Sequence, residues 1–238
     1  MSKQLFVDPR EMRAPGKIEF TDILENQYQK TVKDEVGNFP REDLIRIYRD
    51  MCYIREFETM IQLIKTTGEY QGVPYNHPGP AHLGIGQEAA YVGQAYHLSI
   101  NDFSFGSHRS HGEILARGLR AVETLPEEQL RSIMEDFDGG KILRVLGNSQ
   151  LDIRALGRDF LLYGMTCETF GRENGFNRGL GGSMHAFFTP FGIYPNNAIV
   201  GGSGSIAPGA ALYKLSNHKD GIVVCNIGDA ATACGPVW

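Results

Sequence analysis

The sequence has no long apolar run and few cysteines, and both absences exclude classes of protein. None of its apolar stretches approaches the ~20 residues that a membrane-spanning helix needs, and the polar start MSKQLFVDPREMR lacks the apolar segment of a secretory signal. The four cysteines, Cys52, Cys167, Cys225 and Cys234, form no CxxC pair. This argues against a zinc site and against a disulfide-stabilised secreted domain. We therefore expect a cytoplasmic protein with reduced thiols.

The chain also lacks a strong excess of charge of either sign. Its 23 Lys and Arg residues stand against 28 Asp and Glu residues, which gives a formal net charge of -5. This balance offers no electrostatic attraction for nucleic acid or for an anionic membrane, so neither is an expected partner. With 42% hydrophobic residues, the 238-residue chain is long enough to bury a sizeable core.

Glycine, in contrast, is abundant, with 29 residues that fall mostly in the later part of the chain. Residues 1–38 are polar, carry Pro9 and Pro15, and are predicted to form an extended N-terminal arm. From Pro40 to Gly68, apolar residues recur every three or four positions, which predicts one long amphipathic helix. Further helices are expected after the loop at residues 78–87 and from near Glu113.

The apolar run at residues 222–227 predicts a buried parallel strand, and a carboxylate, Asp229, follows it directly. In open parallel sheets, ligands bind beyond the carboxyl ends of the strands, and an aspartate there suits a hard cation that binds phosphate oxygens. The same residue could instead cap its own helix. The spacing alone leaves both interpretations open.

Two other stretches could bind an anion. In HRSH, Arg109 stands between His108 and His111, an arrangement that favours phosphate binding over a metal pair or a surface ion pair. The glycine-rich turn at 201–205, before a small-residue helix, could cradle a phosphate or simply allow close helix packing. The pattern G-x-G-x-x-G is not matched, so a nicotinamide-binding Rossmann fold does not follow.

Six short motifs follow one another along the chain: REFE (55–58), HLGIGQEA (82–89), HRSHGEILARG (108–118), GLGGSMH (179–185), AIVGG (198–202) and GDAA (228–231). Together they resemble the alpha subunit of the thiamine-diphosphate-dependent E1 component of 2-oxo acid dehydrogenase complexes, of the pyruvate, branched-chain 2-oxo acid or acetoin type. The resemblance implies an α/β thiamine-diphosphate-binding fold, a parallel sheet flanked by helices that is incomplete in this chain. Residues 39–238 would be the N-terminal part of this diphosphate-binding domain, with an insertion at about 138–178.

The resemblance also implies roles for particular residues. Asp229 matches the aspartate that coordinates Mg²⁺ on the cofactor diphosphate, and Arg109 matches an arginine that contacts the diphosphate. His82 and His111 match histidines near the reactive carbon, where they could bind substrate or transfer protons. The full set of implied cofactor-binding residues is His108, Arg109, Ala198, Val200, Gly228, Ala230 and Ala231.

Three departures from the family pattern accompany these matches. His108 stands where the family more often has tyrosine, and Ala230 stands where glycine is usual. The second protein ligand of Mg²⁺, an asparagine, is expected beyond Trp238. We therefore expect a piece of a longer alpha subunit or of an alpha-beta fusion, and weak cofactor binding by residues 1–238 alone.

The implied activity is oxidative decarboxylation of a 2-oxo acid, or the corresponding reaction of acetoin, with acyl transfer to a lipoyl group. The implied partners are an E1 beta subunit or fused beta domain, a second alpha-beta pair that completes a heterotetramer, and a lipoyl-bearing acyltransferase core. The chain should be inactive without the beta part. Alternatives are another thiamine-diphosphate enzyme of transketolase type, a degenerate non-catalytic subunit, or a phosphate-binding protein of Rossmann type.

Overall fold

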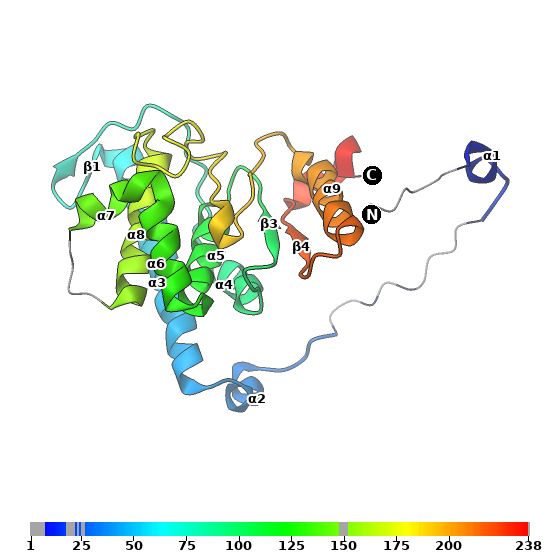
Figure 1. Ribbon diagram of the computed structural model, residues 1–238, viewed down its shortest axis with the longest axis horizontal. Coiled ribbons are helices and arrows are strands. Elements are labelled where there is room, and N and C mark those ends of the chain that lie inside the picture. The colour runs from blue at the N-terminus through cyan, green and yellow to red at the C-terminus, as the bar shows by residue number, and fades with distance from the viewer. Residues whose placement is uncertain (1–7, 18–21, 23, 25–26, 148–151, 238) are drawn as a thin grey trace. The chain divides into compact units, whose positions relative to one another are not determined.

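A computed structural model describes residues 8–17, 22, 24, 27–147 and 152–237 (Figure 1). The chain divides into two compact units, Met1–Ile45 and Arg46–Trp238. The described part of the first unit contains two short helices, α1 (Pro9–Met12) and α2 (Val32–Glu35), a 3-10 turn η1 (Val36–Asn38), and the first turn of α3 (Arg41–Thr67). Part of the predicted arm lies outside the described residues, and its boundary at residue 38 stays a prediction.

The long helix predicted between Pro40 and Gly68 is confirmed as α3. Its apolar residues at three- and four-residue spacing form one buried stripe that includes Ile54, Phe57 and Ile61. The helix ends at Gly68, whose φ of 79° is favourable only for a residue without a side chain. After it, β1 (Glu69–Tyr70) and β2 (Val73–Pro74) form an antiparallel hairpin.

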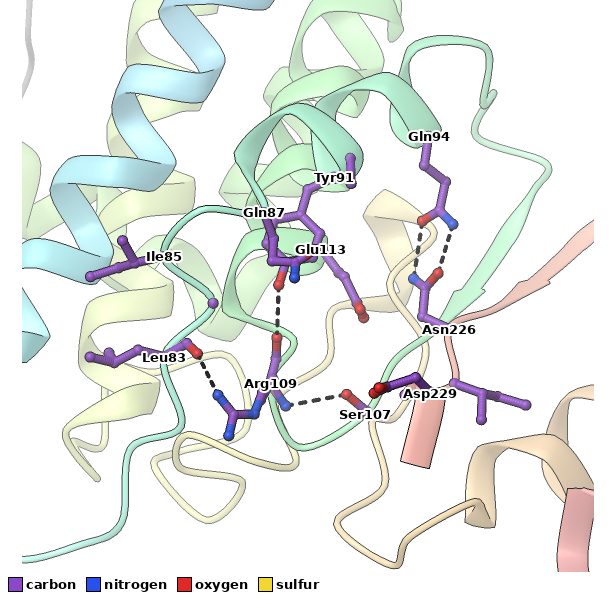
Figure 2. Close-up of a pocket in the computed structure, with 14 residues that line it drawn as sticks. Leu83, Ile85, Gln87, Tyr91, Gln94, Ser107, Arg109, Glu113, Asn226 and Asp229 are labelled. Carbon is purple, nitrogen blue, oxygen red and sulfur yellow. Dashed lines mark hydrogen bonds between the residues drawn. The ribbon is translucent and has the colours of Figure 1, made fainter. Parts of the chain in front are cut away.

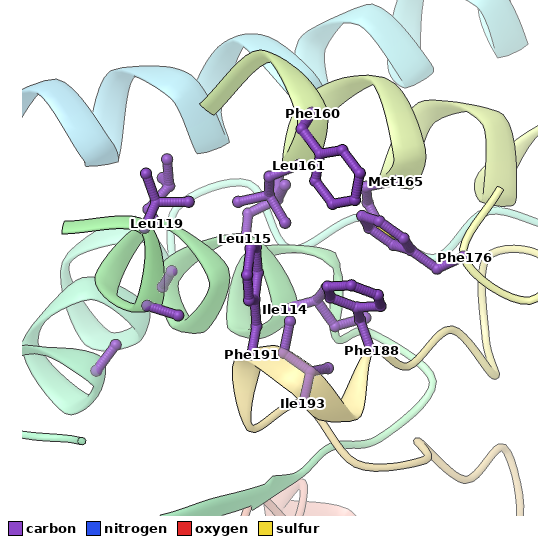
Figure 3. Close-up of a cluster of buried hydrophobic side chains, with 14 of the residues drawn as sticks. Ile114, Leu115, Leu119, Phe160, Leu161, Met165, Phe176, Phe188, Phe191 and Ile193 are labelled. Carbon is purple, nitrogen blue, oxygen red and sulfur yellow. The ribbon is translucent and has the colours of Figure 1, made fainter. Parts of the chain in front are cut away.

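The core of the second unit lies between helices. Side chains of α5 (His111–Thr124) and α8 (Ile153–Thr169) meet those of the loops around residues 176–193, as Figure 3 shows. Phe160, Leu161 and Met165 of α8 are fully buried, so this part of the segment 138–178 belongs to the core. Whether that segment is an insertion relative to the family stays a prediction. The other helices and 3-10 turns between Glu88 and Phe191 are α4 (Glu88–Tyr96), α6 (Glu127–Asp136), η2 (Phe137–Gly140), α7 (Lys141–Leu146) and η3 (Thr189–Phe191).

The second unit also contains a short two-stranded parallel sheet. β3 (Phe103–Phe105) pairs with β4 (Val223–Cys225), and Ile193 adds a single parallel bridge at Ser104. The helix α9 (Gly202–Ser216) lies beside these strands (Figure 1), where Ser203 Oγ donates to the Gly106 carbonyl at 2.7 Å. Two 3-10 turns, η4 (Asp229–Ala233) and η5 (Gly235–Val237), follow β4. The α/β class is thereby confirmed, and a parallel strand does form within the predicted run 222–227. The strand is shorter than predicted, Val223–Cys225, and its residues are half-buried where the sequence predicted a buried strand.

The glycine-rich stretch at 201–205 is a helix start rather than the separate turn that the sequence predicts. Gly201 adopts a left-handed conformation with φ of 77°, and α9 begins at the next residue. A Cβ on Gly202 would stand 2.9 Å from the Asn197 side chain, so the small residue permits close approach of the preceding loop. At the first turn of α9, the glycines therefore allow close packing, which is one of the two interpretations that the sequence left open.

The crossing of α5 and α8 depends on Gly118. A Cβ at this position would lie 2.5 Å from Cδ1 of Leu161, a distance that forces the fully buried leucine to move. We expect Gly118→Ala to lower the free energy of unfolding by roughly 1–3 kcal/mol, the usual cost of overpacking. Gly209→Ala in α9 is the matched control, because a Cβ there meets nothing within 4 Å. Equal urea midpoints for the two variants would contradict this account of the crossing.

No helix among the described residues is long and apolar enough to cross a membrane. The four cysteines form no disulfide with one another in this structure. The expected cytoplasmic location stays a prediction.

Candidate functional site

Two adjoining pockets lie beyond the carboxyl ends of β3 and β4. We name the larger, of about 500 Å³, the α4 pocket, because Tyr91 and Gln94 of α4 and Gln87 at its N-cap form one of its walls (Figure 2). The smaller, of about 340 Å³, is the α9 pocket, which extends toward the start of α9. The parallel pairing places the loop after β3 beside the loop after β4. Both pockets therefore share six lining residues: Ser107, Arg109, Asn226, Ile227, Gly228 and Asp229.

Asp229 presents an exposed carboxylate to both pockets. It is the first residue of η4, and Gly228 before it occupies the N-cap position. No hydrogen bond to the Asp229 side chain is found among the described residues, and Thr232 Oγ1 donates to its backbone carbonyl at 2.5 Å. The alternative in which Asp229 caps its own helix is therefore wrong, and the carboxylate is left available to a ligand.

Arg109 lies at the junction of the two pockets. Its Nη1 donates to the Leu83 carbonyl at 3.0 Å, and its backbone N–H donates to Ser107 Oγ at 3.3 Å (Figure 2). Within the described part of the chain, no carboxylate forms an ion pair with Arg109, so the surface ion-pair interpretation finds no support there. A guanidinium has five donors, and most of those of Arg109 are left for an anion in the pockets.

His108 and His82 form a pair next to this arginine. Their rings meet edge to face with centroids 4.8 Å apart, and His108 lines the α9 pocket. Burial lowers the pKa of His108, and the neighbouring His82 and Arg109 lower it further. At neutral pH the His108 ring is therefore uncharged and can donate one hydrogen bond and accept another.

His111 is placed differently from the other candidate residues. It is fully buried and lines neither pocket; its Nδ1 lies 3.2 Å from Glu58 Oε1, and its Nε2 lies 2.6 Å from Ser183 Oγ. Both ring nitrogens are thus engaged, which leaves no position for a metal shared with His108. Among the residues that the structure describes, no group of three or more His, Cys, Asp or Glu side chains could hold a metal ion.

The candidate residues with small side chains line the α9 pocket or lie next to it. Val200 and Gly228 line the α9 pocket together with Ala230 and Ala231. Ala198 is half-buried between Asn197 and Ile199, which both line this pocket. Seven of the ten predicted residues therefore line one or both pockets. They are His108, Arg109, Val200, Gly228, Asp229, Ala230 and Ala231.

Glu113, in the first turn of α5, is a pocket residue that the sequence did not reveal. It lines the α4 pocket, and its Oε2 is buried without a hydrogen-bond partner among the described residues. Burial raises the pKa of this carboxyl from 4.5 to about 7. Nearby, the side-chain amides of Gln94 and Asn226 hydrogen-bond to each other at 2.6 and 3.0 Å. The sequence marks Glu113 only as part of a helix start.

Known proteins resemble this chain over most of its length. The model of the dehydrogenase E1 component family matches residues 144–238, which include β4 and the turn that carries Asp229. The chain is 29% identical over 206 residues to the alpha subunit of an acetoin:2,6-dichlorophenolindophenol oxidoreductase from Bacillus subtilis (strain 168). It is 28% identical over 203 residues to the alpha subunit of the pyruvate dehydrogenase E1 component from Rhizobium meliloti (strain 1021). The chain is therefore similar to the dehydrogenase E1 component family and to E1 alpha subunits.

The alignments cover most of this chain but less than half of each relative. These alignments cover 87% and 85% of this chain but 47% and 44% of the two relatives. The chain therefore spans about half the length of the curated relatives that it matches. The predicted resemblance to E1 alpha subunits is confirmed, and it extends over most of the 238 residues.

A second residue that sequence reasoning missed is Glu168 of α8, in the segment for which the sequence indicates no chemical role. Its side chain is fully buried and accepts backbone hydrogen bonds of 2.7–3.0 Å from one glycine-rich loop. The donors are the N–H groups of Asn177, Gly179, Gly181 and Gly182. This carboxylate fixes the loop that ends at Ser183, and the cluster of glycines in the E1 motif GLGGSMH was its only sequence signal.

The raised pKa of Glu113 predicts that the stability of this chain depends on pH. Between pH 4.5 and about 7 the folded state holds a proton on Glu113 that the unfolded state releases, so stability falls as pH rises through this range. Glu113→Gln removes the effect. We expect the free energy of unfolding of the variant, relative to the parent chain, to be greater at pH 8 than at pH 5 by up to about 3 kcal/mol. Urea titrations at both pH values measure this, with the exposed Glu128→Gln as control; an unchanged difference would contradict it.

Proposed function

We propose that this chain provides the diphosphate-binding half of a thiamine diphosphate site in the E1 alpha subunit of a 2-oxo acid or acetoin dehydrogenase. The observation that carries the proposal is the convergence of Arg109 and Asp229 on one pair of pockets at the strand ends. One side chain supplies positive charge for phosphate oxygens, and the other supplies an oxygen ligand for a divalent cation. Neither side chain is paired with an opposite charge in the described chain.

The residues present fit a Mg²⁺-diphosphate group. Mg²⁺ is usually bound through one or two carboxylates together with substrate phosphates and water, so the single carboxylate of Asp229 is compatible with such a site. Ser107 and Asn226 line both pockets and can provide further oxygen contacts. The small side chains of Ala230 and Ala231 leave room beside the strand end.

Bound thiamine diphosphate supplies an electron sink for decarboxylation of a 2-oxo acid. The part proposed for this chain is to hold and orient that cofactor. Arg109 binds the diphosphate, Val200 and Ala198 contact its ring end, and His108 offers an uncharged donor and acceptor beside it. His82 contacts His108 and stays a candidate for proton transfer near the substrate.

The proposal includes partners, because both relatives described above are named as alpha subunits. We propose an E1 beta subunit or fused beta domain as the part that completes the site, a second alpha-beta pair, and a lipoyl-bearing acyltransferase core. We also propose a cytoplasmic location. Without the beta part, the chain is expected to have no activity.

The test is activity of the full-length protein assembled with its beta part. Reduction of 2,6-dichlorophenolindophenol is followed with pyruvate, a branched-chain 2-oxo acid or acetoin as donor, with and without thiamine diphosphate and Mg²⁺. We expect reduction that requires the donor and both cofactors. Turnover only with a ketose phosphate donor would favour a transketolase-type enzyme, and cofactor binding without turnover would favour a non-catalytic subunit.

The departure at Ala230 allows the non-catalytic alternative to be examined separately. Ala230 lines the α9 pocket where the family more often has glycine. If its methyl group hinders the cofactor, Ala230→Gly should strengthen Mg²⁺-dependent cofactor binding and restore turnover. We expect instead that Ala230→Gly changes the affinity little, because the α9 pocket remains open with alanine in place.

A further inference from the structure

Three motifs of the sequence meet in a buried chain of hydrogen bonds. Glu58 in REFE, His111 in HRSHG and Ser183 in GLGGSMH come from α3, the start of α5 and the glycine-rich loop. Glu58 and His111 are 0% exposed and Ser183 is 5% exposed. None of the three lines the α4 pocket or the α9 pocket. A role for these residues therefore has to act through neighbouring groups.

The second oxygen of Glu58 connects this chain of bonds to the site. Glu58 Oε2 accepts a hydrogen bond from the Gly84 N–H at 3.2 Å. The residue before Gly84 is Leu83, whose carbonyl receives the Arg109 guanidinium at 3.0 Å. One carboxylate thus holds both the turn that receives the Arg109 side chain and the histidine two residues after Arg109 in the sequence.

The three side chains meet at the two ring nitrogens of His111. Nδ1 lies 3.2 Å from Glu58 Oε1 and Nε2 lies 2.6 Å from Ser183 Oγ, and the tautomer of the ring decides which nitrogen donates. The order of acid, histidine and serine is that of a hydrolase triad, but this serine is buried away from both pockets. Ser183 is therefore not placed to act as a nucleophile in either pocket. The three side chains instead hold α3, the start of α5 and the glycine-rich loop in place.

We propose that Glu58 is a positioning residue for Arg109, which it orders before the diphosphate binds. Arg109 is exposed, and a free arginine side chain loses rotational freedom when it binds an anion. Through Gly84, Glu58 fixes the Leu83 carbonyl that accepts from the Arg109 guanidinium. Through His111, it fixes the backbone that follows Arg109. Ordering the side chain in advance lowers the cost of binding. The Ser183 end of the chain is fixed in turn by Glu168 through the glycine-rich loop.

The inference rests on the proposed diphosphate site, and a double-mutant cycle tests it. The affinity of the full-length protein, assembled with its beta part, is measured by calorimetry for inorganic pyrophosphate with Mg²⁺. We expect Glu58→Ala to weaken binding roughly tenfold, the scale of one ordered long side chain. In the Arg109→Ala background the same substitution should cause no further loss, because Glu58 acts through Arg109. Equal losses in both backgrounds would overturn the proposal.

Matched variants separate positioning from general destabilisation. Asp50→Ala removes another buried carboxylate from α3, one that pairs with Arg49 instead of the site loops, and should leave pyrophosphate affinity unchanged. Glu58→Gln keeps an acceptor for Gly84 and should restore binding to within roughly threefold of the parent. If Glu58→Ala does not fold, Glu58→Met fills the same space without an acceptor and should show the same non-additive loss. A parent protein that binds no pyrophosphate would refute the proposed function itself, whereas binding with an additive cycle would refute only the role of Glu58.

Discussion

Replacement of Asp229 by alanine is expected to abolish Mg²⁺-dependent binding of thiamine diphosphate to the full-length protein assembled with its beta part. Of the acidic side chains in the described part of the chain, this exposed carboxylate is the one that lines both pockets. Loss of a direct metal ligand should exceed the roughly 10- to 100-fold effect of removing an outer partner of such a ligand. Calorimetric titration with the cofactor in the presence of Mg²⁺ measures the loss.

The control for this variant is Asp159→Ala, which removes an exposed carboxylate from α8 outside both pockets. It should bind the cofactor with parental affinity. Asp229→Ala itself should unfold at nearly the same urea concentration as the parent, because no hydrogen bond to the Asp229 side chain is found among the described residues. Intact Mg²⁺ affinity and turnover in Asp229→Ala would refute its assignment as the metal ligand.

Arg109→Ala is expected to weaken cofactor binding by roughly 10- to 100-fold, the value of about 1.5–3 kcal/mol for hydrogen bonds to a charged group. Arg109→Lys keeps the positive charge but loses the planar set of donors, so it should recover only part of the affinity. The measurements are the affinity for thiamine diphosphate and its apparent KM in the assembled enzyme. Because substrate does not contact this residue in the proposed arrangement, kcat at saturating cofactor should change less than KM.

Arg131→Ala, on the exposed side of α6, removes an arginine that lines neither pocket and should leave both constants unchanged. A full recovery by Arg109→Lys would show that charge alone is required and that the fork geometry of the guanidinium contributes nothing. No effect of Arg109→Ala on cofactor affinity would exclude it from the diphosphate site.

The features that could be predicted from the sequence are those written in local patterns. The three- and four-residue spacing of Ile54, Phe57 and Ile61 predicted α3 because a helix brings these positions onto one face. The apolar run that forms β4 likewise placed Asp229 beyond a strand end. Arg109 was assigned to the same site only through the resemblance to E1 alpha subunits, since no local pattern relates it to a residue 120 positions later. In the structure both residues line the same two pockets, and their shared role stays a prediction.

The features that could not be predicted depend on contacts between distant segments. Glu58 and His111 are 53 positions apart, and His111 and Ser183 are 72 apart, so no periodicity reveals that they meet. The resemblance implied that His111 lies near the reactive carbon of the cofactor. In the structure its ring, at the start of α5, is fully buried and lines neither pocket. Glu113 was missed because its importance arises from burial of one carboxyl oxygen, which the helical pattern does not encode.

The central claim is that a carboxylate and a guanidinium at the ends of two parallel strands bind a diphosphate together with a divalent cation. The most direct measurement is a calorimetric titration of the full-length, beta-assembled protein with thiamine diphosphate, once with Mg²⁺ and once with EDTA. We expect saturable binding of one cofactor per chain with Mg²⁺ and a loss of roughly 100-fold or more in affinity with EDTA. The same affinity in both titrations, or no binding in either, would contradict the account.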